Sequence, residues 1–215
     1  MEIYETEEEQ LEALKRWWKE NGQATIVGLL VGIGFILGWD YWQNYKKDRL
    51  AEASGIYEQL LKADEAGNKE SAAKLAEHIQ EQYKDTEYAI YSELFEANLK
   101  IQQNDLAAAK QILKDLAAKA DKNLSNIAKI RLVRLMLATG EYEQGLQLVN
   151  EASAQATSSF SGNYDELVGD LYVALDRLDE ARTSYESAIR NNHQSPLLQF
   201  KLDDLTAPEK AEVKK

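Results

Sequence analysis

The sequence predicts an all-α protein, in which a single membrane-spanning helix is followed by a solenoid of paired helices. Three observations lead to this prediction. Residues 21–39 carry no charged side chain. The chain has only 2 prolines and 11 glycines, and four of those glycines lie between residues 28 and 38, so the remainder contains few helix breakers. Small residues also recur at a constant interval of 36 residues, from Ala109 to Gly145 and from Gly145 to Ala181.

Residues 21–42 are the predicted membrane helix. The uncharged run alone would be about 30 Å long as a helix, which matches the hydrocarbon thickness of a bilayer. Aromatic residues flank it where their rings would meet the two headgroup layers, namely Trp17, Trp18, Trp39, Tyr41 and Trp42. A cleaved signal peptide would have a basic start and small residues at its exit. Here the start is acidic and the exit is bulky, which favours an uncleaved anchor in the lipid bilayer.

Two G-x-x-x-G pairs lie inside this helix, Gly28 with Gly32 and Gly34 with Gly38. At 100° per residue the two pairs face directions roughly 240° apart. Small residues allow a neighbouring membrane helix to approach closely, so the four glycines are candidates for packing against membrane partners or a second copy. The alternative is that glycine is simply common in membrane helices.

Residues 1–20 are expected to form a short amphipathic helix along the membrane surface, with Leu11, Leu14 and Trp18 on one face. Asn21-Gly22 would separate it from the spanning helix. A mobile acidic tail is the alternative. The charges leave the orientation open, because three basic residues lie close to each end of the membrane helix.

Composition excludes several functions. A net charge of −12 disfavours nucleic-acid binding. The absence of cysteine excludes disulfides and thiolate catalysis. No sequence motif of an enzyme, a metal site or a cofactor site is present, so we expect no catalytic residue, no metal and no cofactor. His78 and His193 are expected to be solvent-facing helix residues, and the carboxylates are expected to be solvated.

Residues 43–205 are predicted to form one repeat domain. Eight helices are expected over residues 45–66, 70–83, 88–103, 106–119, 125–139, 142–156, 164–175 and 178–191, with a last amphipathic helix over 197–205 and a disordered tail over 206–215. The last pair is similar to a tetratricopeptide repeat. In this pattern Gly169 lets the paired helices approach, Tyr172 and Tyr185 fill the space between them, and Ala181 and Ala188 lie at tight crossings. Gly145 takes the position of Ala181 one repeat earlier.

The first helix of each pair would line the concave face, where such solenoids usually bind a protein segment. The aligned positions give a groove that is mostly apolar and ends acidic: Tyr91, Leu94, Asn98 and Ile101, then Ile127, Ile130, Arg134 and Leu137, then Asn163, Glu166, Asp170 and Val173. Some repeats of this kind hold a C-terminal carboxylate with lysine and asparagine, but Leu94, Ile130 and Glu166 stand at the positions concerned. For each apolar residue in the set, ordinary core packing is the alternative.

The whole chain resembles the bacterial YfgM family of ancillary SecYEG translocon subunits. The resemblance is carried by the acidic start MEIYETEEEQLEALKRWWKENG, the anchor GLLVGIGFILGWDYW and the degenerate repeats that follow. It implies a non-catalytic inner-membrane protein with a cytoplasmic N-terminus and a periplasmic repeat domain. It also implies association with SecYEG and the periplasmic chaperone PpiD, and a role in handing on exported chains. A link to the response regulator RcsB is known in the family, but no motif here carries it.

Two other functions are considered. A membrane-tethered scaffold for other cell-envelope or respiratory assembly factors would have the same architecture. A peptidase or lyase would need a clustered catalytic site that the sequence does not show. The sequence therefore predicts a tethered protein-binding module, with its anchor directed at membrane partners and its solenoid at a chaperone or client.

Overall fold

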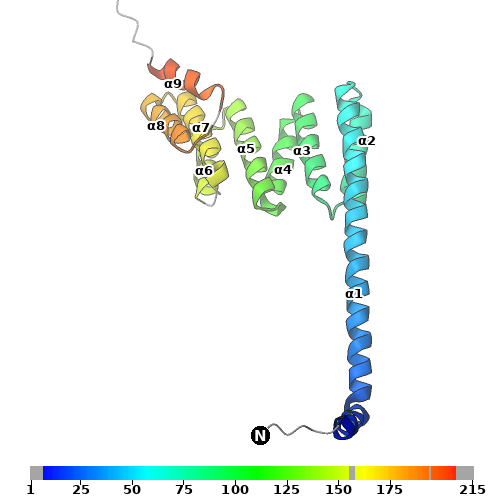
Figure 1. Ribbon diagram of the computed structural model, residues 1–215. Coiled ribbons are helices and arrows are strands. Elements are labelled where there is room, and N and C mark those ends of the chain that lie inside the picture. The colour runs from blue at the N-terminus through cyan, green and yellow to red at the C-terminus, as the bar shows by residue number, and fades with distance from the viewer. Residues whose placement is uncertain (1–6, 155–157, 194, 207–215) are drawn as a thin grey trace, which may run out of the picture. The chain divides into compact units, whose positions relative to one another are not determined.

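The computed structural model describes residues 7–154, 158–193 and 195–206. Within these residues the chain forms nine α-helices and no strand, which confirms the predicted all-α class (Figure 1). The helices are α1 (Glu7–Glu65), α2 (Lys69–Gln82), α3 (Glu87–Gln102), α4 (Leu106–Lys119), α5 (Lys122–Ala138), α6 (Tyr142–Ser153), α7 (Ser158–Ala174), α8 (Leu178–Arg190) and α9 (Leu198–Thr206).

The chain divides into two compact units, residues 1–52 and residues 53–215. Helix α1 is continuous from Glu7 to Glu65, so the expected helix break at Asn21-Gly22 is wrong. The Asn21 side-chain amide donates to the Trp17 carbonyl oxygen at 3.2 Å, and the Thr25 hydroxyl donates to the Asn21 carbonyl oxygen at 2.9 Å. Gly22 leaves room for the Trp18 ring, which lies 3.2 Å from where a Cβ atom would be. These local contacts support the helix at the predicted break.

Within the repeat unit the helices begin and end at residues suited to those positions. The side chains of Asn68, Asp105 and Asp121 accept hydrogen bonds from backbone amides in the first turns of α2, α4 and α5. Gly67 and Gly140 adopt φ values of 75° and 78° in the turns after α1 and α5. The ends of the other repeat helices lie close to the predicted ones, but α7 begins six residues before the predicted residue 164.

The hydrophobic core of the repeat unit consists of successive clusters between neighbouring helices. Leu60, Ala72, Ala76 and Ile79 form the first, from the end of α1 and from α2. Leu94, Leu113 and Leu132 belong to the next, which joins α3, α4 and α5. Val133, Val149, Tyr164 and Leu171 belong to the third, which joins α5, α6 and α7. Each helix therefore packs mainly against its neighbours in sequence, as expected of a solenoid.

The repeat-packing residues lie between α6, α7 and α8. A Cβ atom on Gly169 would lie 2.3 Å from the Tyr185 ring, and one on Gly145 would lie 3.0 Å from the Leu171 side chain. Ala181, Tyr185 and Ala188 are buried together, and the half-buried Tyr172 packs against the same cluster. The small residues thus lie where α7 approaches its neighbours.

Helix α9 is the helix expected after Pro196, and Leu198, Leu202 and Leu205 pack on the α8 cluster. Figure 1 shows α7, α8 and α9 together at the end of the repeat unit. Thr206 ends α9 and is helical, so the predicted tail does not begin there. The rest of that predicted tail, residues 207–215, lies outside the described residues.

Candidate protein-binding surfaces

Helix α1 carries the candidate membrane surface. It is the one helix among the described residues that is long and apolar enough to cross a bilayer, and only 6% of its most apolar 18-residue window is buried. Six of its exposed apolar residues are Ile26, Leu29, Val31, Phe35, Ile36 and Leu37. An apolar surface of this kind requires lipid or protein to cover it.

The predicted membrane-packing glycines, Gly28, Gly32, Gly34 and Gly38, are all open: a Cβ atom on any of them would meet nothing within 4 Å. Gly34 and Gly38 line a shallow hollow with Phe35, Trp39 and Trp42. The predicted interface aromatics, Trp17, Trp18, Trp39, Tyr41 and Trp42, are likewise exposed. The Lys46 ammonium lies 3.8 Å from the centre of the Trp42 ring. The surface is therefore available to lipid or to a partner helix.

The repeat unit holds a pocket of about 300 Å³ between α3, α4 and α5. It is lined by Leu94, Ala97, Asn98, Ile101, Leu113, Arg131, Arg134, Leu135 and Ala138. Four of the predicted groove residues, Leu94, Asn98, Ile101 and Arg134, are therefore brought together. The sequence did not indicate Arg131, whose guanidinium donates to the Leu94 carbonyl oxygen at 3.2 Å.

The other predicted groove residues of the first two repeats lie elsewhere. Ile130 is only 7% exposed and belongs to the core between α5 and α7, and Leu137 packs against that same cluster. Ile127 packs against the core on the α4 side. Tyr91 forms a cluster of rings with Tyr57 and Tyr88, with ring centres 5.6–6.0 Å apart. For Ile130 the core-packing alternative therefore holds.

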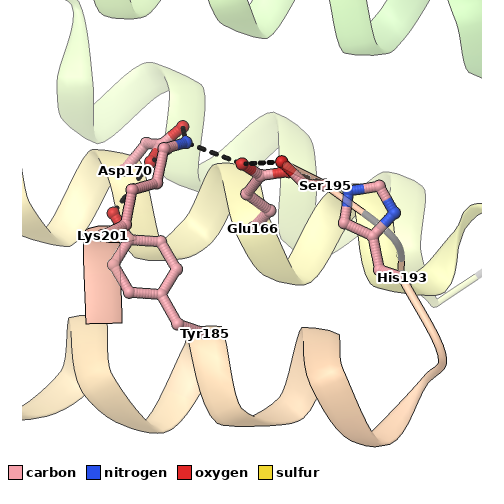
Figure 2. A network of polar contacts seen from close by, with 6 residues as sticks. All are labelled: Glu166, Asp170, Tyr185, His193, Ser195 and Lys201. Atoms are coloured by element: carbon pink, nitrogen blue, oxygen red, sulfur yellow. Dashed lines mark hydrogen bonds and ion pairs between the residues drawn. The ribbon is translucent and has the colours of Figure 1, made fainter. Parts of the chain in front are cut away.

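The acidic end of the predicted groove is filled by the chain itself (Figure 2). The Lys201 ammonium on α9 donates to Glu166 Oε1 at 2.7 Å and lies 2.7 Å from Asp170 Oδ1, both on α7. The Tyr185 hydroxyl on α8 donates to Asp170 Oδ1 at 2.8 Å. These contacts join α7, α8 and α9. Of the remaining positions in this group, Asn163 is half-buried and Val173 is exposed.

The loop between α8 and α9 contributes two further contacts to the same carboxylate. His193 Nε2 lies 2.7 Å from Glu166 Oε2, and the Ser195 hydroxyl donates to Glu166 Oε1 at 3.1 Å. The expectations that His193 faces solvent and that Glu166 is solvated are therefore wrong, since the whole Glu166 residue is 8% exposed. His78 is exposed and packs edge-on against Tyr83. The sequence did not indicate the contacts from His193, Ser195 and Lys201.

Electrostatics stabilise this cluster in its charged form. Burial alone would raise the pKa of Glu166, but hydrogen bonds from Lys201 and His193 outweigh it and hold that pKa below its ordinary value. Burial would lower the pKa of Lys201, whereas its bonds to Asp170 and Glu166 raise it overall. Burial, followed by the bond to Asp170, raises the pKa of Tyr185. The cluster therefore behaves as a satisfied ion-pair network. No group of side chains suited to a metal ion occurs within the described ranges.

Comparisons with known proteins agree with this architecture. The family model of a tetratricopeptide repeat-like domain matches residues 15–207. An "Ancillary SecYEG translocon subunit" of Haemophilus influenzae is 31% identical over 202 residues, which cover 93% of this chain and 97% of that protein. Proteins with the same name from Escherichia coli K12 and Neisseria gonorrhoeae are 29% and 25% identical, and the matches cover 96% and 93% of this chain and 100% and 97% of those proteins.

A long apolar helix joined to a tetratricopeptide repeat-like domain defines the class: a helical-repeat protein with a candidate membrane anchor. Within that class the match extends over almost the full length of the relatives. The chain belongs to the family of ancillary SecYEG translocon subunits, which confirms the resemblance found in its sequence.

Proposed function

We propose that this protein is a non-catalytic ancillary subunit of the SecYEG translocon in the bacterial inner membrane. The observation that carries the proposal is the full-length match to relatives bearing that name. The exposed apolar surface of α1 supports it, because this surface can be covered by lipid and by the membrane helices of a translocon. The match to a tetratricopeptide repeat-like domain also supports it, because solenoids of this kind usually bind protein segments.

In this proposal the N-terminus is cytoplasmic and the repeat domain is periplasmic. The absence of cysteine allows a direct test with two single-cysteine variants, Lys15→Cys and Gln144→Cys, because the parent chain gives no background labelling. A membrane-impermeant maleimide should label the Gln144→Cys variant in intact spheroplasts, and the Lys15→Cys variant only after permeabilisation. The opposite pattern would reverse the orientation.

The translocon association can be tested by crosslinking in the membrane. Leu29 is exposed on α1, so a photoreactive residue at this position should crosslink to SecY. The same probe at Gln144, on the exposed surface of α6, serves as the control and should give no SecY product. Replacing Gly28 and Gly32 with leucine should weaken the Leu29 crosslink if close helix packing contributes. Crosslinks from Leu29 to unrelated membrane factors alone would favour the scaffold function instead.

The proposal extends to the repeat domain as the part that binds PpiD or a similar periplasmic chaperone and assists the handover of exported proteins. The pocket between α3 and α5 supports a protein-binding role. Copurification after mild detergent extraction tests this: SecY and PpiD should be enriched together with the full chain. The response regulator RcsB is a further proposed partner, and the same experiment tests it. Enrichment of assembly factors without SecY would contradict the proposal.

A further inference from the structure

The pocket between α3, α4 and α5 combines an apolar interior with a basic rim. Leu94, Ala97, Leu113 and Leu135 supply apolar lining, and Ala97 and Leu113 are almost fully buried. Arg131 and Arg134 lie one helical turn apart on α5, and both are exposed. A pocket of about 300 Å³ is large enough for one or two apolar side chains. The guanidinium groups of these two arginines can donate hydrogen bonds to an acceptor that lies beside the pocket.

These two arginines differ from the other three arginines of the repeat unit. Arg177, Arg182 and Arg190 each lie within 4 Å of a carboxylate on their own helix or its first turn. Lys110 and Lys119 pair with Glu141 and Glu93 on other helices. Within the described residues, neither Arg131 nor Arg134 has a carboxylate partner, and the bond that Arg131 makes is to a neutral carbonyl.

Arg131 also interacts electrostatically with a cluster of aromatic side chains. Arg131 lies close enough to Tyr57 to act on its phenol: burial raises the pKa of Tyr57, and the positive charge of Arg131 partly opposes that rise. Tyr57 packs with Tyr88 and Tyr91, and the three rings are half-buried. Arg131 therefore lines the apolar pocket and also acts electrostatically on Tyr57.

We propose that this surface binds a segment of a partner protein that carries an apolar side chain next to an aspartate or glutamate. The apolar side chain would enter the pocket, and the carboxylate would accept hydrogen bonds from Arg134 and Arg131. The inference rests on the proposed protein-binding role of the solenoid and names the chemistry of its partner. Charge complementarity carries it, because two arginines without a carboxylate partner among the described residues lie beside an apolar pocket, where they can bind a carboxylate of a partner.

The test uses the full chain in detergent micelles and fluorescein-labelled, C-terminally amidated peptides, with binding followed by fluorescence anisotropy. The probe peptide carries glutamate-leucine-glutamate between glycine-serine linkers. A second peptide replaces both glutamates with glutamine, and a third replaces the leucine with serine. The first peptide should bind saturably and more weakly as salt rises, and the other two should each bind roughly tenfold more weakly.

Variants of the protein locate the binding. The Arg134→Gln variant should bind the probe peptide roughly tenfold more weakly than the parent protein. The Ala138→Leu variant should do the same, because the larger side chain narrows the pocket from an exposed position at the end of α5. Arg190→Gln is the matched control, because it removes the same charge from an exposed site on α8 and should leave binding unchanged. Arg131→Gln should also weaken binding, but it removes a bond to α3 as well.

Three results would overturn the inference: no saturable binding of the probe peptide, equal binding of the glutamine peptide, or an unchanged affinity in the Arg134→Gln variant. Preference for a peptide that ends in leucine with a free carboxylate and lacks glutamate would assign the pocket to a chain terminus instead. A change in self-association of the Arg134→Gln variant without a change in peptide affinity would assign it to a second copy. Copurification of SecY with Arg134→Gln separates this inference from the proposed function, because that association should persist.

Discussion

Equivalent positions of successive repeats have different charge partners in the middle of the solenoid and at its C-terminal end. In the middle, the pocket between α3 and α5 holds Asn98 and Arg134, and the arginine has no carboxylate partner among the described residues. At the end, Asp170 on α7 takes the position of Asn98 and Arg134, Glu166 takes that of Leu94, and Lys201 of α9 pairs with both carboxylates. The end is completed by the chain's own last helix, while the middle is left open.

This difference separates a structural network from a binding surface. A buried charge without a partner is strongly unfavourable, so Glu166 needs the contacts from α9 and its preceding loop. An exposed arginine has no such need, because water solvates it. Leaving an exposed arginine without a carboxylate partner therefore costs little free energy. Its charge remains available to a partner protein. Substitutions at the two sites should therefore affect different properties, stability at the end and recognition in the middle.

The largest expected effect is at the close approach of α7 and α8. In the Gly169→Ala variant the new Cβ atom would lie 2.3 Å from the Tyr185 ring, which is itself almost fully buried and cannot move freely. We expect a loss of about 3 kcal/mol in unfolding free energy, measured by urea denaturation of the full chain in detergent. Gly55→Ala is the control, because its Cβ meets nothing within 4 Å, and it should stabilise the helix by about 0.5–1 kcal/mol. Equal effects of the two variants would show that the end of the solenoid is not tightly packed.

The next effect concerns the contact between α9 and α7. The Lys201→Met variant leaves Glu166 and Asp170 without their cation. We expect the unfolding free energy to fall by about 2 kcal/mol. This loss is smaller than for a fully buried ion pair, because the Lys201 side chain is 28% exposed. Hydrogen exchange of the α9 amides should rise before that of α4. Lys74→Met, whose partner Glu70 is 81% exposed, should change stability by about 0.5 kcal/mol at most. Unchanged exchange in α9 would mean that apolar contacts alone hold this helix.

The same network predicts how α9 responds to pH. Because the pKa of Glu166 is lowered in the folded protein, its contribution is complete above the ordinary glutamate pKa of about 4.3 and is lost as pH falls through the folded value. The raised pKa of Lys201 gives a contribution that is complete below about pH 10.4 and is lost as pH rises through its folded value. Exchange protection of α9 should thus be constant from about pH 6 to 9 and fall in acid. The Glu166→Gln variant should remove most of the acid dependence at α9, with α4 as the internal reference.

The sequence predicted the regular parts of this molecule better than its side-chain contacts. Helix periodicity and turn residues located the repeat helices because these signals are local. The continuity of α1 through Gly22 was missed because the Trp18 ring covers that glycine, which a helix-breaking rule does not consider. Glu166 looked like a solvated carboxylate since its partners, among them Lys201, are distant in sequence. The same limit applies to Ile130, whose place in the core depends on the packing of α7 against α5.

The smallest expected effect on stability is at the pocket between α3, α4 and α5. Its measurement tests most directly whether the middle and the end of the solenoid differ. Arg134 is exposed and unpaired by any described carboxylate, so Arg134→Gln should change the unfolding free energy by no more than about 0.5 kcal/mol. Urea denaturation beside the Lys201→Met variant measures the contrast directly. A loss above about 1 kcal/mol would mean that the Arg134 side chain stabilises the fold as Lys201 does. The charge in the middle of the solenoid would then be structural, and its removal could no longer be used to assign a partner.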